Sequence, residues 1–289
     1  MCPVLKAGFP AVGGVILHLV NSCLATSDYP DPWKHSIIHP IFKSGDPSDP
    51  SNFRPISIIP IISKVVERVV QRQLYHYLSY NHLLSSTQHG FRPRHSTETA
   101  LMTVTDDILG ATDRGEISLL CLIDLSKCFD VINHEILLRK MQLYGIDTKW
   151  FSAYLRGHMQ SVELKDSTGR TRTSRPLANQ MGVFQGSALG PLLFTVFAND
   201  MSLYTDDALV VQYADDTQIM VSGRKCDLPV LISRMETNLA LLDMWFRANA
   251  LKVNASKTQL ITFGSRKISA TFRISPYLSV KQPSYRVWK

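Results

Sequence analysis

Apolar positions recur at helical spacing in two segments of the N-terminal part of the chain. Five residues near the start fall on one helical face: Ile16, Leu19, Val20, Cys23 and Leu24. A longer series with the same spacing predicts a second amphipathic helix: Ile62, Val65, Val66, Val69, Val70, Leu74, Tyr77 and Leu78. The proline-rich stretch between them contains two short apolar runs, at residues 37–38 and 56–59, which predict strands around a turn.

The rest of the chain alternates helical patterns with short strand patterns. Ser96 or Thr97 is predicted to cap a helix that runs to about Asp113 and ends at Gly115. The run ISLLCLID, residues 117–124, has strand length and no polar alternation, which is typical of a strand covered on both faces. Further helices are predicted at 134–144, 148–156, 188–204 and 228–248, and further strands at 162–164, 170–177, 208–213, 217–221 and 259–263. This order predicts an α+β fold in which a sheet is backed by helices.

Composition and charge are those of a globular protein with a basic excess. The 289 residues are 45% hydrophobic and 19% charged, and the formal net charge is +7. A positive excess suits a polyanionic partner such as nucleic acid, although a soluble basic protein has the same balance. The five cysteines are scattered, with no CxxC pair, as expected for reduced thiols inside the cell. No signal peptide or transmembrane segment is predicted, so we expect an intracellular protein, nuclear or cytoplasmic.

Three aspartates stand where solvation alone does not explain them. Asp124 ends the most hydrophobic strand pattern, and Asp215 and Asp216 lie on a turn between two apolar arms, VVQY and TQIMV. Two adjacent carboxylates on a partly buried turn are costly unless a cation compensates them. An Asp-Asp pair by itself is also an ordinary turn dipeptide, but the framing by apolar strands disfavours that reading. If the strands are neighbours in one sheet, the three carboxylates form a site suited to two Mg²⁺ ions, with Mn²⁺ as a substitute.

Six sequence blocks occur in a characteristic order along the chain: SNFRPIS, QHGFRPRHST, LIDLSKCFD, GVFQGSALGPLLFTVFAND, YADD and LKVNASKT. In these blocks, over residues 33–264, the chain resembles the reverse transcriptase domain of LINE-type, non-LTR retrotransposons of the Jockey-like branch. The resemblance implies the fingers and palm of a right-hand polymerase, with an antiparallel palm sheet. It implies an N-terminal helical extension at 1–32, fingers at 33–115 with parts near 145–180, a palm at 116–264, and a truncated or irregular tail at 265–289. It also implies an RNA template, a DNA primer and dNTP as partners, and no membrane.

The resemblance assigns metal-binding and catalytic roles to five residues of the predicted palm. Asp124 would bind both ions, and the Leu125 carbonyl would bind one of them. Asp215 would be the second shared ligand, and Asp216 would be a closer ligand of the primer-side ion. Lys257, in NASKT, stands where a lysine can protonate the departing pyrophosphate, although a surface lysine is an equal alternative.

Four further residues are assigned to the template, the primer and the nucleotide. Phe129 lies at the family's steric gate, where a large ring crowds a ribose 2′-hydroxyl, although a core phenylalanine is the simpler alternative. Gln185 would lie near the template base, and Gly186 would allow close approach of backbone to the nucleotide. Tyr213 is expected to pack near the primer end.

Three cations of the predicted fingers are assigned to phosphate binding. Lys43 and Arg54 stand where this family supplies positive charge to the triphosphate. Arg92, in GFRPR, is assigned either to the triphosphate or to the template backbone. Exposed, solvated charge is the alternative for all three.

The chain departs from the family's pattern at several points. Phe184 replaces a common proline, Cys128 a common alanine, and Ala250 a frequent glycine. The residues after Gly264 do not continue into the family's next hairpin, and no thumb is expected, so we predict weak primer-template binding and low, distributive activity. A catalytically inactive fragment that binds nucleic acid or a partner protein therefore stays open as an alternative. An RNA-dependent RNA polymerase is a third interpretation, which Phe129 disfavours.

Overall fold

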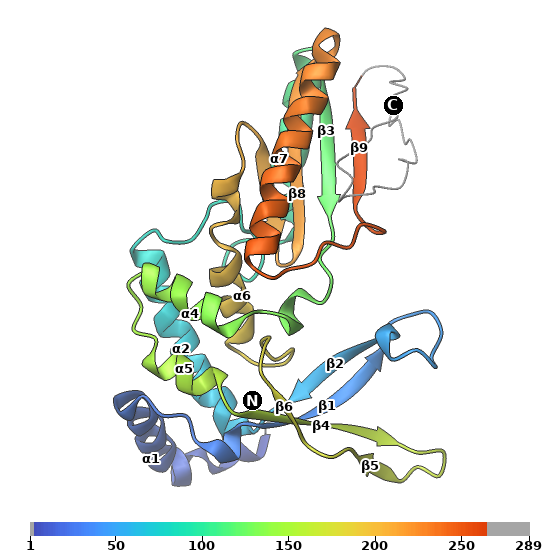
Figure 1. The fold of residues 1–289 in the computed structure, drawn as a ribbon. Coiled ribbons are helices and arrows are strands. Elements are labelled where there is room, and N and C mark those ends of the chain that lie inside the picture. Colours follow the sequence, from blue (N-terminus) through green and yellow to red (C-terminus); the bar gives the residue numbers. More distant parts are fainter. Residues whose placement is uncertain (1–2, 265–289) are drawn as a thin grey trace. The chain divides into compact units, whose positions relative to one another are not determined.

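The structure is a computed structural model that describes residues 3–264, and the chain divides into two compact units. The first unit consists of Met1–Leu83 and Phe129–Val196, and the second of Leu84–Cys128 and Phe197–Lys289. Each unit is thus built from two separate stretches of chain (Figure 1). The predicted segments divide the chain differently, because they place residues 84–115 with the fingers and residues 129–144 and 181–196 with the palm. The predicted tail at 265–289 and the predicted absence of a thumb lie outside the described residues.

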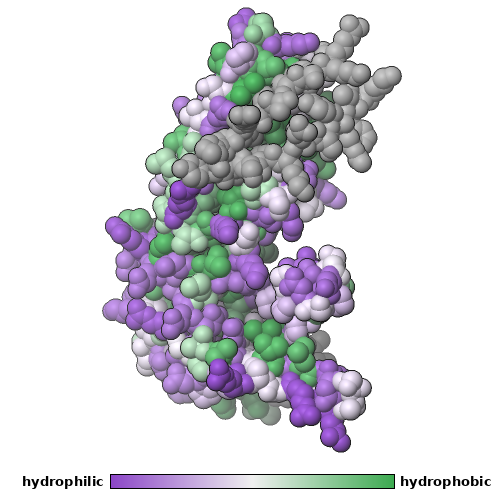
Figure 2. Space-filling model, turned by 45° about the vertical axis from the view of Figure 1, so that its right-hand side comes forward, coloured by the Kyte–Doolittle hydropathy of each residue, from purple (hydrophilic) through white to green (hydrophobic). Residues whose placement is uncertain are grey.

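The first unit contains a mixed five-stranded sheet. Its strands are β1 (His35–Phe42), β2 (Phe53–Ile58), β4 (His158–Lys165), β5 (Thr171–Thr173) and β6 (Leu177–Asn179). β1 and β2 pair antiparallel from Ile37 opposite Ile58 to Phe42 opposite Phe53, which confirms the predicted hairpin. β1 also pairs with β4 in parallel, and β4 pairs antiparallel with both β5 and β6. The two projecting hairpin ends, β1–β2 and β4–β5, carry mostly hydrophilic side chains (Figure 2).

Helices and an aromatic cluster form the core of the first unit. Its helices are α1 (Pro3–Thr26), α2 (Ile61–Tyr80), α4 (His134–Leu143), α5 (Lys149–Leu155) and most of α6 (Gly190–Ala198). Tyr29 lies at the centre of an aromatic cluster and is 1% exposed. Its ring meets Trp33, Trp150 and Tyr154 edge-on, with ring centroids 5.1–5.8 Å apart. Edge-on pairs add to the stabilisation that burial alone provides.

The second unit contains an antiparallel four-stranded sheet in the order β7-β8-β3-β9. The strands are β3 (Glu116–Ile123), β7 (Leu209–Tyr213), β8 (Asp216–Arg224) and β9 (Gln259–Phe263). β3 lies inside the sheet with a partner on each side, and both of its faces are buried, as its apolar run predicted. A buried cluster joins it to α3 (Thr97–Asp113) through Ala100, Val104, Leu120, Val211 and Met220. α7 (Leu228–Ala248) also packs on this sheet (Figure 1).

Local sequence signals account for several helix ends. Ser96 caps α3 by accepting from the Thr99 amide, and the Thr99 hydroxyl accepts from the Ser96 amide in return. α7 has the bounds that the sequence predicts, and beyond it Ala250 adopts a left-handed φ of 55°. The Leu251 amide then bonds the Phe246 carbonyl at 2.8 Å, which closes the helix end.

One expectation about a helix is wrong. The helix predicted at 188–204 ends at Ala198, and a short 3₁₀ turn follows at Met201–Tyr204. α1 contains a 20-residue segment, Ala7–Thr26, that by length and composition alone is long and apolar enough to cross a membrane. This helix buries Ile16, Val20 and Cys23, as its periodicity predicted, while Leu19 is exposed. A signal sequence or a core helix has the same length and composition, so α1 by itself assigns no membrane.

Candidate active site

The sheet of the second unit brings the three predicted carboxylates to one edge. β3 and β8 run antiparallel with Ile123 opposite Thr217, so the next pair along the same register is Asp124 opposite Asp216. β7 and β8 meet in the turn after Tyr213, where Tyr213 pairs with Asp216 and Asp215 lies between them. Residues about 90 positions apart in the chain are therefore neighbours because of one strand register.

The electrostatics of this edge are those of partly buried like charges. The pKa of the Asp216 carboxyl is raised by its partial burial, then by the charge of Asp215 and then by that of Asp124. A bound cation would relieve this repulsion, and carboxylate oxygens are the ligands that Mg²⁺ prefers. The donor set therefore fits a hard divalent ion chemically. Within residues 3–264, however, no three His, Cys, Asp or Glu side chains are already grouped closely enough to hold a metal.

A glutamine of the QHGF segment holds the turn that carries the aspartates. Gln88 is 1% exposed, and its Oε1 accepts from the Ala214 amide at 3.2 Å and from the Gly90 amide at 2.7 Å. Its Nε2 donates to the Ala214 carbonyl at 3.4 Å. The adjacent backbone continues the contact, since the His89 amide donates to the Gln212 carbonyl at 2.7 Å. No role for Gln88 was expected from the sequence.

Gly90 has a steric reason to be glycine. A Cβ at this position would lie 2.1 Å from the Ala214 amide nitrogen and 2.8 Å from its Cα. No side chain fits there without displacing the backbone of the turn. Close packing of QHGF against the turn therefore requires glycine at position 90.

The LKVNASKT segment pairs with the chain that follows β3. The Ser126 amide donates to the Lys252 carbonyl, and the Asn254 amide donates to the Asp124 carbonyl, both at 2.8 Å. These bonds flank an antiparallel bridge between Leu125 and Val253, and neither uses the Leu125 carbonyl, the predicted metal ligand.

The structure does not place the predicted proton donor, Lys257, at the three aspartates. Its side chain is exposed and makes no ion pair within residues 3–264. Its assignment to pyrophosphate stays a prediction.

In the first unit, the QG loop (residues 184–190) is fastened to its surroundings at both of its predicted functional residues. The Gln185 carbonyl accepts from the Ser57 amide of β2 at 2.8 Å, and the Gln185 Nε2 donates to Oδ1 of Asp130 at 2.8 Å. Gly186 has φ +132°, and a Cβ there would lie 2.4 Å from the Ser57 carbonyl oxygen. The need for glycine is thus explained by contact with β2, a reason that the sequence analysis did not foresee. Asp130 was also missed, although it lies within the LIDLSKCFD block.

The rings of the first unit pack within that unit. Phe129 stacks on Phe194, with centroids 4.5 Å apart and planes 25° apart, and its carbonyl accepts from the Val183 amide. Phe184, which replaces a common proline, packs against His158 with centroids 4.5 Å apart. The stack holds Phe129 in place, as either a gate or a core residue requires.

The predicted phosphate-binding cations differ in their surroundings. Lys43 directly follows β1, where its amide donates to the Asn52 carbonyl at 2.8 Å, and Arg54 lies on β2 opposite Ile41. Both side chains are exposed.

Arg92 instead turns inward. Its Nη1 donates to the carbonyls of Ser85 at 2.5 Å and Gln88 at 3.2 Å. Arg92 therefore braces the QHGF loop, and its predicted contact with phosphate stays untested.

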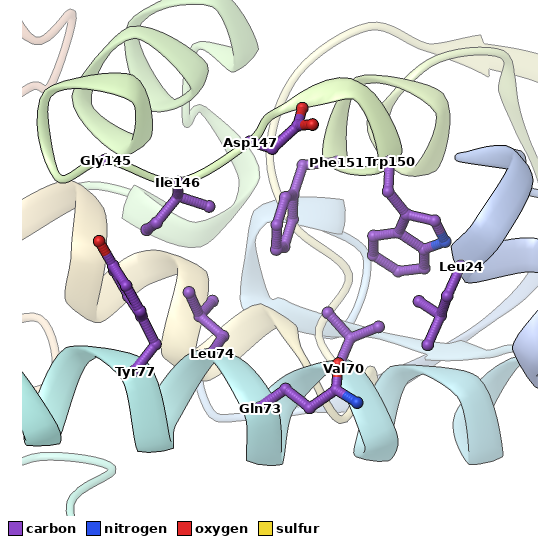
Figure 3. Close-up of a pocket in the computed structure, with 10 residues that line it drawn as sticks. All are labelled: Leu24, Val70, Gln73, Leu74, Tyr77, Gly145, Ile146, Asp147, Trp150 and Phe151. Atoms are coloured by element: carbon purple, nitrogen blue, oxygen red, sulfur yellow. The ribbon is translucent and has the colours of Figure 1, made fainter.

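One cavity lies apart from these residues. It has a volume of about 280 Å³ and is lined by α1, α2, the loop after α4, and α5 of the first unit (Figure 3). Its walls are mostly apolar, with Val70, Leu74 and Tyr77 on one side and Trp150 and Phe151 on the other. None of the predicted site residues lines it.

Comparisons with known proteins identify the family. Residues 41–285 match the family described as Reverse transcriptase (RNA-dependent DNA polymerase). The chain is 31% identical over 273 residues to a probable RNA-directed DNA polymerase from transposon BS of Drosophila melanogaster, over 89% of this chain and 29% of that protein. It is 29% identical over 267 residues to the RNA-directed DNA polymerase from mobile element jockey of the same species, over 86% of this chain and 27% of that protein. The chain thus belongs to the reverse transcriptase family, and it spans less than a third of the length of these relatives.

Solved structures agree on the fold. A telomerase structure from Candida albicans aligns with 92% of this chain and 49% of that chain, at a TM-score of 0.54 and 15% identity. Another, from Candida tropicalis, gives 0.55 and 16%, over 86% of this chain and 54% of that chain. Identities this low support the α+β reverse transcriptase fold alone. The family match also runs past Gly264, where the sequence analysis ended the resemblance.

Proposed function

We propose that this chain is the RNA-directed DNA polymerase domain of a retroelement, which adds dNTP to the 3′-hydroxyl of a DNA primer paired with an RNA template. The observation that carries the proposal is the sheet edge of the second unit. There, Asp124 and Asp215 both raise the pKa of Asp216, so the three carboxylates share one field. The basic excess of the chain suits its nucleic-acid partners.

In this proposal the second unit is the palm and the first unit is the fingers. Asp124 and Asp215 would hold two Mg²⁺ ions together, with Asp216 and the Leu125 carbonyl as further ligands. When bound, such ions lower the pKa of the primer hydroxyl and stabilise the leaving pyrophosphate. The remaining chemistry falls to side chains that orient the substrates and move protons.

Those side chains divide between the two units. Lys43 and Arg54, exposed on the β1–β2 hairpin, attract and orient the triphosphate. Gln185 and Gly186 form the platform for the template base and the nucleotide, and Tyr213 packs at the primer end. Lys257 protonates the departing pyrophosphate.

Primer extension tests this function. Oligo-dT on poly-rA is extended with dTTP in the presence of Mg²⁺ or Mn²⁺, by the wild type and by Asp215→Asn. The substitution removes a charge and keeps the side-chain shape, so extension should fall by about 100-fold or more while the unfolding temperature is kept. Asp106→Asn, on the exposed face of α3, is the matched control and should extend like the wild type.

Two results would contradict the proposal. Equal extension by Asp215→Asn and the wild type would show that the sheet edge is not the active site. Salt-sensitive RNA binding by a wild type that extends no primer would favour the non-catalytic alternative.

A further inference from the structure

A buried carboxylate in the first unit has no part in the proposed chemistry. Glu67, on α2, is 1% exposed. Its Oε2 accepts from the Ala188 amide at 2.6 Å and from the Leu189 amide at 3.3 Å. These two amides lie between the QG platform and the first turn of α6 (Gly190–Ala198).

The surroundings of Glu67 disfavour its ionised form. Burial is the largest effect, and it raises the pKa of Glu67 to about 7 against the lowering effect of the two amide bonds. The titratable groups that face it are Tyr154 from α5, Tyr29 from the segment before β1, and Lys64 from its own helix. An apolar side chain of the same volume would fill the space without this cost, so packing alone does not explain a glutamate here.

The position of Glu67 completes a set of fastenings around the QG loop. β2 holds the Gln185 carbonyl through the Ser57 amide, and Asp130 holds the Gln185 side chain. Within the loop, the Ser187 hydroxyl accepts from the Gly190 amide at 2.7 Å. Glu67 fixes the remaining end, where the loop enters α6.

The amino end of α6 is therefore occupied by a carboxyl group of the protein itself. Free amides and the helix dipole at such an end attract phosphate or carboxylate groups. Here Glu67 uses two of those amides, so the structure offers a loop anchor at this point rather than a site for the triphosphate.

We infer that Glu67 is a positioning residue that fixes the Gln185–Gly186 loop in the geometry required for nucleotide and template binding. Its effect passes through the Ala188 and Leu189 amides, and it touches neither substrate. The inference rests on the proposed function for its consequence, while the anchoring itself is independent of any activity.

Hydrogen exchange measures the anchoring directly. In Glu67→Leu the two amides lose their acceptor, and exchange in the peptide covering residues 184–190 should accelerate about tenfold or more. Glu67→Gln keeps a carbonyl oxygen that can accept the same bonds, so its exchange should stay within about threefold of the wild type. Val70→Ala, one turn along α2 and facing the cavity of Figure 3, destabilises the same helix without removing a bond to the loop and should leave this exchange near the wild-type rate.

Steady-state kinetics measure the consequence. In templated addition of one nucleotide, Glu67→Leu should raise the KM for dNTP about tenfold with a smaller change in kcat, because a displaced platform weakens substrate placement. Glu67→Gln should restore most of the loss, and Val70→Ala should leave KM unchanged.

The outcomes of these two experiments either support or overturn the inference about Glu67. Unchanged exchange in Glu67→Leu overturns the inference whether or not the wild type extends primers. Faster exchange with an unchanged KM also overturns it, since the anchor would then serve folding only. A wild type that extends nothing defeats the proposed function, and the exchange comparison still decides the anchoring.

Discussion

Gln88 fixes the backbone of Ala214, a residue 126 positions later in the chain and the one that precedes the two turn aspartates. Ala214 has φ 56°, in the left-handed region that costs an L-residue about 1–2 kcal/mol. Three hydrogen bonds from one buried amide hold the turn region in this conformation, two of them to Ala214 itself. The geometry of the carboxylates therefore depends on a residue outside the sheet that carries them.

Replacing Gln88 should remove the hydrogen bonds that support the turn. Gln88→Leu has nearly the same volume but leaves the Gly90 amide and both polar groups of Ala214 without their partner. We expect a loss of about 2–3 kcal/mol in the free energy of unfolding, measured by urea denaturation.

Primer extension by Gln88→Leu should fall by more than its loss of stability explains. Leu239→Ala, buried in α7 of the same unit, is the control, since its cavity costs a comparable amount without touching the turn. Equal extension by the two variants would show that Gln88 serves folding only.

Phe129→Ala tests the sugar gate. If the ring excludes a ribose 2′-hydroxyl, the variant should accept rNTP more readily than the wild type does. The ratio of kcat/KM for rNTP to kcat/KM for dNTP should rise about tenfold or more. Phe194→Leu removes the stacking partner and keeps Phe129, so it controls for loss of packing. An unchanged ratio in Phe129→Ala would assign the ring to the core of the first unit.

Ala250→Gly should stabilise the protein. Ala250 adopts φ 55° after α7, a conformation that glycine takes without the steric cost of a Cβ. We expect a gain of about 1 kcal/mol in the free energy of unfolding. Ala240→Gly, at an exposed position in the interior of α7, should lose about 1 kcal/mol, so the pair has opposite signs. Two losses would contradict the role of Ala250 as the helix terminator.

The buried Glu67 should make stability depend on pH. Its pKa is about 7 in the folded protein against 4.5 for the free group, so the folded state holds the extra proton between these values. The unfolded state binds fewer protons there, and stability contributed by Glu67 is therefore lost as pH rises from about 4.5 through 7.

The comparison with Glu67→Gln isolates this effect. The difference in free energy of unfolding between variant and wild type should shift in favour of the variant by about 3 kcal/mol between pH 4.5 and pH 8. Taking the difference removes the opposite slope of His158, whose burial lowers its pKa to about 4. A difference that does not vary with pH would show that Glu67 titrates normally.

Much of the fold could be predicted because its signals are local or periodic. The cap signal at Ser96 or Thr97, the apolar run of β3 and the helical pattern at 228–248 each predicted an element that the structure contains. The α6 helix was predicted too long because its end depends on distant partners. Asn199 accepts from the Ser85 amide and Asp200 accepts from the Trp245 indole, and the regular helix stops before them.

For the candidate site, too, the residues with a local sequence signal were predicted and those without one were not. Asp124, Asp215 and Asp216 were proposed from the sequence because charge interrupts apolar strands, and the antiparallel pairing of β3 with β8 brings their chain segments to one edge. Gln88, which supports the turn of the second unit, and Glu67, which holds the QG loop of the first unit, were not expected. Apart from Gly90, their backbone partners lie more than 100 positions away, and such bonds leave no period or composition in the sequence.

The interleaving of the two units has a consequence for biosynthesis. β3 leaves the ribosome with neither of its neighbours, because β8 and β9 begin only at residues 216 and 259. For that interval the most apolar strand of the protein has two unpaired edges, the state in which nascent chains aggregate. Any shortened version that stops before residue 259 would keep at least one of those edges open permanently, so neither unit can be produced by a single cut.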